Sequence, residues 1–430
     1  MSHHRQRVIL VYAKTGYAFR DFLDAARALD IDVVPASDRC GTLDDPWGDS
    51  ALPLRFEDPA AAIRRLVLEA KRRGVDAIIP VGDRAALIAA GANEALGLAG
   101  HRAGAAAAAA NKAASRAHCQ AAGIAVPAFI ELETQLTPAA VTAAAESIAA
   151  RLGYPVVIKP LALSASRGVM RCDSPAEFRA SYRRLERLLA QPEVAALGGE
   201  LATRILVEQF VVGREVAVEA LASAGRVEIL AIFDKPDPLD GPFFAETLYI
   251  TPSRLAAQTQ QAVAEVTTRA AAALGLHHGP IHAELRLAAS GPVILEVAAR
   301  AIGGLCGRVL RFGAGMSLEE LVLRHATGRP LPERPGQTGS GAGVMMLPVE
   351  QAGTYRSVRG LAAARRVPHI SGIEITAKPG QALLPLPEGE SYMGFIFAQA
   401  PSPAAAEEAL RRAAQRLAFV IAPHLPMAEP

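Results

Sequence analysis

The chain has little of several features that would assign it to a specialised class. Its 430 residues include 45 basic and 43 acidic side chains, a formal net charge of +2. It therefore lacks the positive charge typical of a dedicated nucleic-acid binder. Cysteines are few and far apart, at Cys40, Cys119, Cys172 and Cys306. Without a CxxC or Cys/His cluster, they argue against a zinc site or a disulfide framework and indicate buried thiols in a reducing cytoplasm.

Long apolar runs are missing too. The run at residues 8–13 is too short for a signal peptide, and no stretch reaches the roughly 18 uncharged residues of a membrane span. Hydrophobic residues make up 51% of the chain and charged residues 20%, which is ample for a large core. No repeat of solenoid period is present. The sequence predicts a soluble cytoplasmic protein of about three domains.

The first hundred residues alternate short apolar runs with helical patterns. Apolar runs at 8–12, 31–35 and 77–81 are separated by helical spacing at 18–29 and 60–73. This alternation predicts a parallel α/β unit. A Gly/Ala-rich stretch at 97–110 marks its predicted end.

The middle of the chain is predicted to be α+β with antiparallel strands. Thr137 before a proline predicts a helix that ends near Gly153, and Ser174 with Glu177 forms a capping box. Strands are predicted at 155–159, 169–171, 205–210, 215–221 and 227–233. After Pro330 the chain becomes Gly/Pro-rich, and then gives short strands and a last helix at 403–417.

The most informative stretch is a predicted β-hairpin with its turn at 290–292. Pairing symmetric about Ser290 puts Leu285 opposite Leu295 and, on the other face, Glu284 opposite Glu296. Directly opposed Cβ atoms lie about 4.5–5.5 Å apart, where like charges destabilise a sheet. A divalent cation would turn this repulsion into a binding site, and carboxylate oxygens suit Mg²⁺ shared with substrate phosphates.

Two ordinary alternatives compete with the metal interpretation. The register could slip by one residue, or each glutamate could pair with an arginine. However, Arg300, Gly303 and Gly304 follow the hairpin directly. An arginine and a glycine-rich turn beside two carboxylates favour a functional site.

Three motifs, taken in order, resemble the ATP-grasp superfamily over roughly residues 102–328. Lys159 precedes a small-residue loop at 164–169, residues 207–215 resemble the hinge that holds adenine and ribose, and the hairpin glutamates with Arg300 resemble the metal carboxylates and catalytic arginine. Within the superfamily, stretches at 233–238, 279–284, 296–300 and 391–398 look most like L-amino acid ligases, which join amino acids into dipeptides. Ala298 replaces an asparagine that is common in the wider superfamily, which puts one oxygen ligand of the metal in doubt.

The resemblance implies an α/β and α+β multidomain architecture with an ATP-grasp fold. An N-terminal parallel, Rossmann-like α/β domain would span 1–104. The ATP-grasp domain, with its ATP cleft between two subdomains, would span 105–328. A small C-terminal α+β domain would span 329–430.

The resemblance also implies roles for individual residues. Lys112 and Lys159 would hold the phosphates of ATP, together with the small-residue loop, which is not a Walker A motif. The loop residues are Ser164, Ser166, Arg167 and Gly168. The adenosine-binding residues would be Glu208, Val211 and Glu215, and the metal ligands Glu284 and Glu296. Arg300 would be catalytic, with the Gly303 and Gly304 N–H groups stabilising an oxyanion. The substrate-binding residues would be His282, Glu219 and Glu246.

Each role has an ordinary alternative. A lone lysine is usually a solvated surface cation, the small-residue loop could be a plain hairpin turn, and Glu219 could lie at a solvated sheet edge. A lone histidine such as His282 is usually structural.

The implied reaction is ATP-dependent amide formation between a carboxylate and an amine, expected to be L-amino acids. The carboxylate attacks the γ-phosphate while two Mg²⁺ ions, or Mn²⁺, neutralise charge. The resulting acylphosphate reacts with the amine, and ADP and phosphate are released. A carboxylase that activates bicarbonate and a non-catalytic nucleotide-binding module are the alternatives. The expected partners are small-molecule substrates and a second copy of the chain, with no nucleic acid or membrane.

Overall fold

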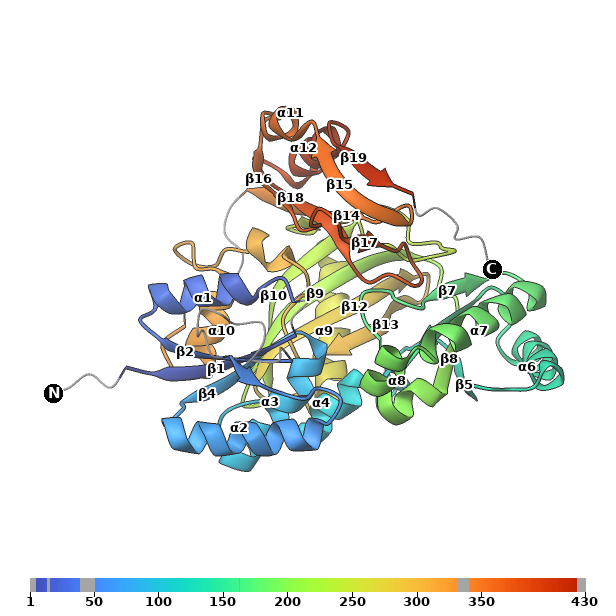
Figure 1. Cartoon of the computed structure of the whole chain (residues 1–430), viewed down its shortest axis with the longest axis horizontal. Helices are drawn as coiled ribbons and strands as arrows, with labels where there is room; N and C mark the ends of the chain where they lie inside the picture. The colour runs from blue at the N-terminus through green and yellow to red at the C-terminus, as the bar shows by residue number, and fades with distance from the viewer. Residues whose placement is uncertain (1–4, 14–15, 39–50, 162, 332–339, 424–430) are drawn as a thin grey trace.

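The computed structural model describes residues 5–13, 16–38, 51–161, 163–331 and 340–423. Three groups of elements follow one another along the chain, coloured from blue through green and yellow to red in Figure 1. Cys119, Cys172 and Cys306 are buried free thiols, as expected, whereas Cys40 lies outside the described residues. No helix within these ranges combines the length and apolarity of a membrane span.

The N-terminal group is the predicted parallel α/β unit. Its sheet has the order β3-β2-β1-β4, and every pairing is parallel. The strands are β1 (Arg7–Tyr12), β2 (Asp32–Ser37), β3 (Leu52–Pro53) and β4 (Ala77–Val81). The helices are α1 (Phe19–Ala28), α2 (Pro59–Arg73), α3 (Asp83–Leu96) and α4 (Ala103–Ala110). Strand β1 is almost wholly buried, as expected for a parallel sheet with both faces covered by helices.

The Gly/Ala-rich stretch that was expected to end this unit is largely helical. Gly97 caps α3 in the left-handed conformation, with φ of 66°, and the alanines that follow form α4. Alanine is the strongest helix former, so the low bulk of this stretch does not make it a linker. The predicted boundary at 104/105 falls inside α4.

The second group is an antiparallel sheet, β5-β8-β6-β7, with two helices packed on its outer face. We call it the small lobe. Its strands are β5 (Phe129–Glu133), β6 (Val156–Pro160), β7 (Met170–Cys172) and β8 (Arg204–Gln209). Its helices are α6 (Pro138–Arg151), α7 (Pro175–Leu189), α8 (Pro192–Gly198) and η1 (Gly199–Thr203), and α5 (Lys112–Ala121) leads into it. The predicted helix starts are confirmed, because Thr137 and Ser174 accept hydrogen bonds from the Ala140 and Glu177 amides.

The third group is built on an eight-stranded antiparallel sheet of order β13-β12-β9-β10-β11-β14-β18-β16. Its strands are β9 (Arg214–Ser223), β10 (Arg226–Lys235), β11 (Leu248–Thr251), β12 (Gly279–Ala288), β13 (Gly291–Ala298), β14 (Gly341–Pro348), β16 (Ile370–Ile375) and β18 (Tyr392–Ala400). The short sheet β17-β15-β19 adds β15 (Gly353–Arg359), β17 (Ala382–Leu383) and β19 (Ala418–Ala422). The helices are α9 (Ala257–Ala273), η2 (Cys306–Val309), α10 (Leu318–Ala326), α11 (Leu361–Arg365) and α12 (Pro403–Ala414).

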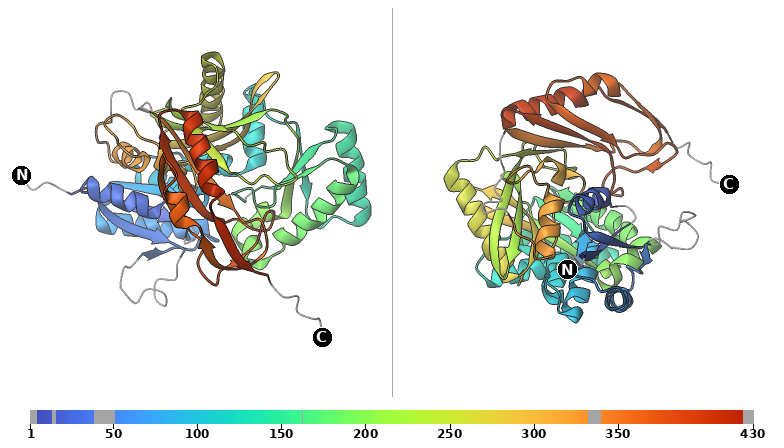
Figure 2. Two further views of the ribbon diagram at one scale, coloured as in Figure 1. Left: turned by 90° about the horizontal axis from the view of Figure 1, so that it is seen from above. Right: turned by 90° about the vertical axis from the view of Figure 1, so that its left-hand side faces the viewer.

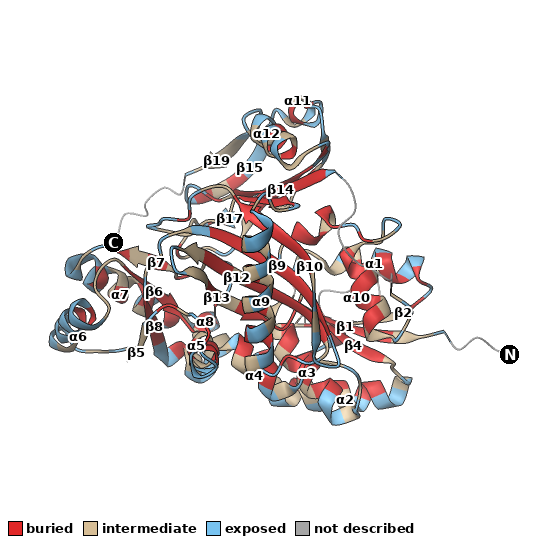
Figure 3. Ribbon diagram, turned by 180° about the vertical axis from the view of Figure 1, so that it is seen from behind, coloured by how far each residue is buried: buried red, intermediate tan, exposed pale blue. Residues whose placement is uncertain are grey.

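The large sheet continues across the predicted boundary at 328/329, because β11 pairs with β14. The division into three domains therefore stays a prediction. Figure 2 shows the C-terminal elements, in orange and red, on one side of the molecule, where β14, β18 and β16 extend the large sheet. In Figure 3, buried residues follow the central strands β9, β10 and β12, whereas the outer faces of α2, α6 and α7 are exposed.

Candidate active site

A cavity lies between the small lobe and the strands β9, β12 and β13. Ten residues named from the sequence line it: Lys112, Lys159, Ser164, Ser166, Glu208, Val211, Glu215, Glu246, Glu284 and Glu296. Seven others do not: Arg167, Gly168, Glu219, His282, Arg300, Gly303 and Gly304. The structure thus brings both lysines and both hairpin glutamates to one space, from segments far apart in the sequence.

Two lysines project from the small-lobe side. Lys112 begins α5, and its Nζ donates to the Leu163 carbonyl at 2.7 Å, next to the small-residue loop. Lys159 on β6 forms an ion pair with Glu208 on β8. Burial lowers the pKa of Lys159, and the negative charge of Glu208 only partly offsets this effect. Neither ammonium is the freely solvated surface cation of the alternative interpretation.

Glu208 has a different environment from the one expected. Its carboxylate is almost fully buried and accepts from Arg116 Nε at 2.6 Å as well as from Lys159. Burial would raise the pKa of Glu208, but the two cations outweigh this effect and lower it. Both oxygens therefore take part in a buried ion network at the cavity wall, in which Glu208 holds Lys159; contact of Glu208 with adenine stays a prediction.

The small-residue loop has an unusual backbone. Ala165 and Ser166 both adopt the left-handed conformation, with φ of 54° and 56°, and Gly168 has φ of 77°. Left-handed geometry costs a non-glycine residue about 1–2 kcal/mol, and such strain persists where surrounding contacts enforce it. A side chain at Gly168 would come within 2.9 Å of Leu185 on α7. The segment that connects the last paired residues of β6 and β7, Ile158 and Met170, runs from 159 to 169, so it is much longer than the two-residue turn of a plain hairpin.

The expected hinge connects β8 to β9. Gly213, with φ of 146°, packs so close to β12 that a Cβ atom would lie 2.2 Å from the Leu287 carbonyl oxygen. Arg286 on β12 donates to the Val211 carbonyl at 3.0 Å. It also lies 4.8 Å from the centre of the Phe210 ring. The hinge thus forms one wall of the cavity against the large sheet.

The hairpin pairing combines a confirmed prediction with an error. Glu284 on β12 lies opposite Glu296 on β13, as predicted. Beyond them the register shifts by one, so Leu285 faces Ile294, and the predicted Leu285–Leu295 pair is wrong. Leu295 forms a bulge, and its carbonyl accepts a hydrogen bond from the buried Arg116. Bulges are frequent on edge strands such as β13.

Lys235, at the end of β10, is the cation at the centre of the carboxylate group. Its Nζ contacts carboxylate oxygens of three glutamates at 2.7, 2.8 and 3.1 Å: Glu215, Glu246 and Glu284. Oxygens of these three glutamates lie within 4.8 Å of one another, a spacing that can hold a metal ion. Carboxylate oxygens are the ligands that Mg²⁺ prefers, so the donor set fits this ion, with Glu296 at the adjacent position.

The pKa values of the Glu284 and Glu246 carboxyls are shifted in opposite directions. Burial would raise the pKa of Glu284, but Lys235 and His282 outweigh burial and lower that pKa well below its ordinary value. Burial and the charge of Glu284 raise the pKa of Glu246, which also accepts from the Tyr249 hydroxyl at 2.7 Å. At neutral pH Glu284 is therefore the firmly ionised member of the pair.

Glu219 and His282 form a second polar unit on the same sheet. The Glu219 carboxylate is fully buried and contacts His282 Nδ1 at 2.5 Å. It also accepts from the Ile302 amide at 3.0 Å. Burial would lower the pKa of His282, but Glu219 reverses this effect and raises the pKa to about 9. The solvated-edge alternative for Glu219 is wrong, since its carboxylate supports His282, whose Nε2 lies 3.5 Å from Glu284.

Arg300 is held by a residue from the N-terminal unit. Its Nε and Nη2 donate to the two Asp83 carboxylate oxygens at 2.6 and 3.1 Å. Asp83 is the first residue of α3 and lines a second cavity that shares Lys112, Leu163, Ser164 and Glu296 with the first. The arginine therefore lies beside the lysine-lined end of the main cavity. Gly304 lines a separate small cavity near α3.

Several residues of this site were not found from the sequence. Lys235 stood inside a stretch already recognised as ligase-like, so the resemblance could have identified it. Asp83 and Arg116 had no local signal, because each gains its partner only when distant segments meet. Arg286 had one local hint, since it follows Glu284 by two residues on the predicted hairpin strand and so shares its face.

Comparison with known proteins agrees with this geometry. The family description "ATP-grasp domain" matches residues 152–309, and "L-amino acid ligase C-terminal domain 2" matches residues 345–422. Residues 152–309 form an ATP-grasp domain. The C-terminal part matches the description of an L-amino acid ligase C-terminal domain, and the multidomain fold class predicted from the sequence is confirmed.

Three proteins illustrate the similarity of this chain to known structures and sequences. The L-amino acid ligase from Bacillus licheniformis has 28% identity, with a TM-score of 0.81 over 97% of this chain and 99% of that one. Carnosine synthase 1 from Gallus gallus is 30% identical over 48% of this chain and 22% of its own length. Carboxyaminoimidazole ribonucleotide synthase from Aspergillus clavatus, solved with ATP, shares the fold at 18% identity, with a TM-score of 0.72 over 96% of this chain and 98% of that one. The chain spans less than two thirds of the first curated relatives that it matches.

Proposed function

We propose that the chain is an ADP-forming carboxylate–amine ligase that joins L-amino acids through an acylphosphate. One observation supports this most strongly: a single cavity is lined on one side by Lys112, Lys159 and a strained small-residue loop, and on the other by Glu284 and Glu296. Cations suit the phosphates of ATP, and opposed carboxylates suit the metal ions that accompany them. The full-length similarity to an L-amino acid ligase supports the substrate class.

The nucleotide would occupy the main cavity. Lys112 and Lys159, which line the cavity, would bind the phosphates, and Glu215 and the Val211 backbone, which line it from the hinge and the start of β9, would bind the adenosine part. Glu284 and Glu296, with Glu215 and Glu246 nearby, would hold Mg²⁺, which when bound screens the charge of the transferred phosphoryl group. The number of ions, and Mn²⁺ as a substitute, stay predictions.

The carboxylate substrate would bind next to Arg300. Asp83 fixes the orientation of the guanidinium by accepting from Nε and Nη2, and the Ala301 carbonyl accepts from Nη1 at 3.0 Å. The remaining N–H groups of Nη1 and Nη2 would donate to a carboxylate or phosphoryl oxygen. An oxygen of the substrate carboxylate attacks the γ-phosphorus of ATP, and ADP leaves. The amine then attacks the acyl carbon of the acylphosphate, and phosphate leaves with the carboxylate oxygen that formed the bridge.

His282 is placed to assist from the sheet. Because its Nδ1 is held by Glu219, the ring has a fixed orientation, and its Nε2 faces Glu284. We assign it to positioning Glu284 and to adding positive charge near the reacting oxygens. The Gly303 and Gly304 amides remain proposed oxyanion donors. A homodimer and a cytoplasmic location stay predictions from the sequence.

Isotope transfer tests the reaction. Substrate carboxylate labelled with ¹⁸O should pass one labelled oxygen to the released phosphate, and ADP should be the nucleotide product. A screen of amino acid pairs for phosphate release, with mass spectrometry of the products, would identify the substrates. Label in AMP would refute the acylphosphate route, and ADP release that needs bicarbonate but no amine would indicate the carboxylase instead. No ADP release with any substrate would indicate a binding module.

A further inference from the structure

The small-residue loop is contacted by a turn more than two hundred residues away in the sequence. We call residues 385–390, between β17 and β18, the latch turn. The Gly168 amide donates to the Pro387 carbonyl at 2.8 Å. Arg167 Nε donates to the Glu388 carbonyl at 2.8 Å, and Arg167 Nη1 lies 3.3 Å from the Glu390 carboxylate. The only cation of the loop is thereby directed to the latch turn and away from the cavity.

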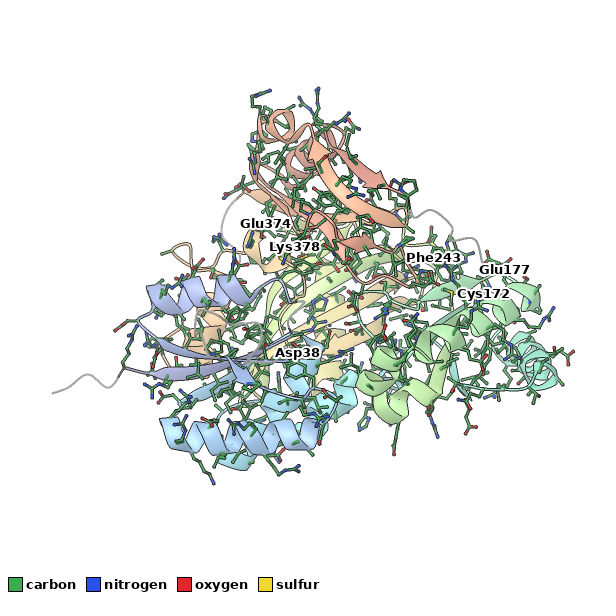
Figure 4. The ribbon with its side chains drawn as sticks, in the orientation of Figure 1. Asp38, Cys172, Glu177, Phe243, Glu374 and Lys378 are labelled. Atoms are coloured by element: carbon green, nitrogen blue, oxygen red, sulfur yellow. The ribbon has the colours of Figure 1, made fainter. Side chains whose placement is uncertain are left out.

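A second contact joins the latch turn to the helix beneath the loop. Arg184 on α7 donates from Nε and Nη2 to both carboxylate oxygens of Glu388, at 2.6 and 2.8 Å. This guanidinium also lies 5.3 Å from the centre of the Phe243 ring. Figure 4 places Phe243 near Cys172 and Glu177, at the edge of the small lobe that faces the C-terminal layer. Leu185, the residue after Arg184 on α7, is the side chain that packs against Gly168 of the loop.

The latch turn has little freedom of its own. The Gly389 amide donates to the Pro385 carbonyl at 2.9 Å, and a Cβ atom on Gly389 would lie 1.8 Å from the Leu384 carbonyl oxygen. A turn this tight presents its carbonyls and Glu388 in one arrangement. The latch turn can therefore hold the small-residue loop in one conformation through the hydrogen bonds between them.

The loop itself depends on outside support. Its internal backbone bonds are limited to the Arg167 amide with the Ser164 carbonyl at 3.2 Å and the Val169 amide with the Ser166 carbonyl at 3.1 Å. Two of its non-glycine residues are left-handed, a conformation that persists only where neighbouring contacts enforce it. The latch turn provides the long-range part of those contacts.

We infer that the latch turn positions the small-residue loop for the phosphates of ATP, so that the C-terminal part of the chain contributes to nucleotide affinity. Glu388 is the positioning residue, and it acts through Arg184 and the loop without touching the nucleotide. The inference rests on the proposed function only in placing the phosphates beneath this loop. It predicts an effect on phosphate binding and none on adenosine binding.

Calorimetric titration of the full chain with AMP-PNP and Mg²⁺, and separately with adenosine, tests the inference. Glu388→Gln should weaken AMP-PNP binding about fivefold, the scale of a partly exposed bidentate pair, and leave adenosine affinity unchanged. The double variant Glu388→Arg with Arg184→Glu should recover most of the loss, because the swapped charges restore the pair. Arg183→Gln is the matched control, since Arg183 on the same helix pairs with Glu186 at 2.9 Å, within α7.

Three results would overturn the inference: unchanged AMP-PNP affinity in Glu388→Gln, an equal loss for adenosine, or an equal loss in Arg183→Gln. The first would show that the loop is fixed without the latch turn. The other two would show that the variants loosen the small lobe in general. Normal AMP-PNP binding without ADP formation from any amino acid pair would count against the proposed reaction alone and leave this comparison intact.

Discussion

Replacing Lys235 by methionine should destabilise the chain strongly, and the structure gives the scale. The ammonium is 2% exposed and contacts three carboxylates within 3.1 Å. Methionine has a similar length and no charge, so Glu246 and Glu284 would lose their shared cation. Removing one partner from a buried ion pair costs about 3–5 kcal/mol, on the order of 10 °C in apparent melting temperature.

The loss should depend on pH. In the wild type, Lys235 and His282 outweigh burial and hold the pKa of Glu284 below its ordinary value of 4.5. Such a group stabilises the fold above pH 4.5, and its contribution is lost as the pH falls through the lower, folded-state pKa. Without Lys235 the Glu246 and Glu284 carboxyls favour their neutral forms more strongly, so the folded-state pKa values of both are higher than in the wild type. The destabilisation is then greatest at neutral pH and shrinks as the pH falls towards 5.

Calorimetric melting at pH 7 and pH 5, with and without Mg²⁺, checks this prediction. Mg²⁺ should stabilise Lys235→Met more than the wild type, because it can replace the missing charge. Adding Glu246→Gln should recover part of the stability, and Lys71→Met, an exposed lysine on α2, should melt like the wild type. A Lys235→Met protein with the wild-type melting temperature, or with the same deficit at both pH values, would refute the reasoning.

Four further predictions follow from the site. Glu296→Gln should abolish ADP formation without lowering the melting temperature, because it removes the repulsion between the opposed Glu284 and Glu296 carboxylates. Retained turnover would disprove the metal assignment. Arg300→Lys should slow ADP formation by about 2–4 kcal/mol in the barrier with unchanged AMP-PNP affinity, and an undiminished rate would refute a catalytic role. Lys159→Met should weaken AMP-PNP binding at least tenfold, as titration calorimetry would show, and equal affinity would make this lysine purely structural. The pKa of His282 is raised to about 9 from an ordinary 6.5, so the protonated ring stabilises the fold fully below pH 6.5, and this stabilisation is lost as the pH rises through 9. In His282→Gln the melting temperature should therefore fall less between pH 6.5 and 9 than in the wild type. An equal fall in both proteins would contradict the charge assigned to His282.

The sequence predicted what depends on local pattern. Apolar runs alternating with helical spacing gave the parallel N-terminal sheet, and the turn after Ala289 gave the hairpin that opposes Glu284 to Glu296. The bulge at Leu295 was not predicted, and the carbonyl that it exposes accepts a hydrogen bond from the buried Arg116, 179 residues away. Propensity and alternation contain no information about such a partner.

Ion pairs between residues far apart in the sequence could not be predicted for the same reason. Asp83 is unremarkable at the start of a helix, yet it fixes Arg300 from 217 residues away. Glu208 was expected to face adenine because its segment resembles the hinge, and no local pattern revealed that Arg116 and Lys159 would both contact its carboxylate. Motif resemblance thus identified residues that line the cavity, whereas their ion-pair partners come from distant segments.

The strand β11 has a consequence for any attempt to exchange parts of this protein with a relative. It meets β10 at a single residue pair, Asp234 with Ile250, but pairs with β14 over four residues. A chain cut after residue 328 would leave β11 with an open hydrogen-bonding edge, the kind of edge that recruits strands from other molecules. A joint placed before β11 would instead separate β12 from β9, which pair over nine residues, so a chimaera should take the whole large sheet, from β9 to β18, from one parent.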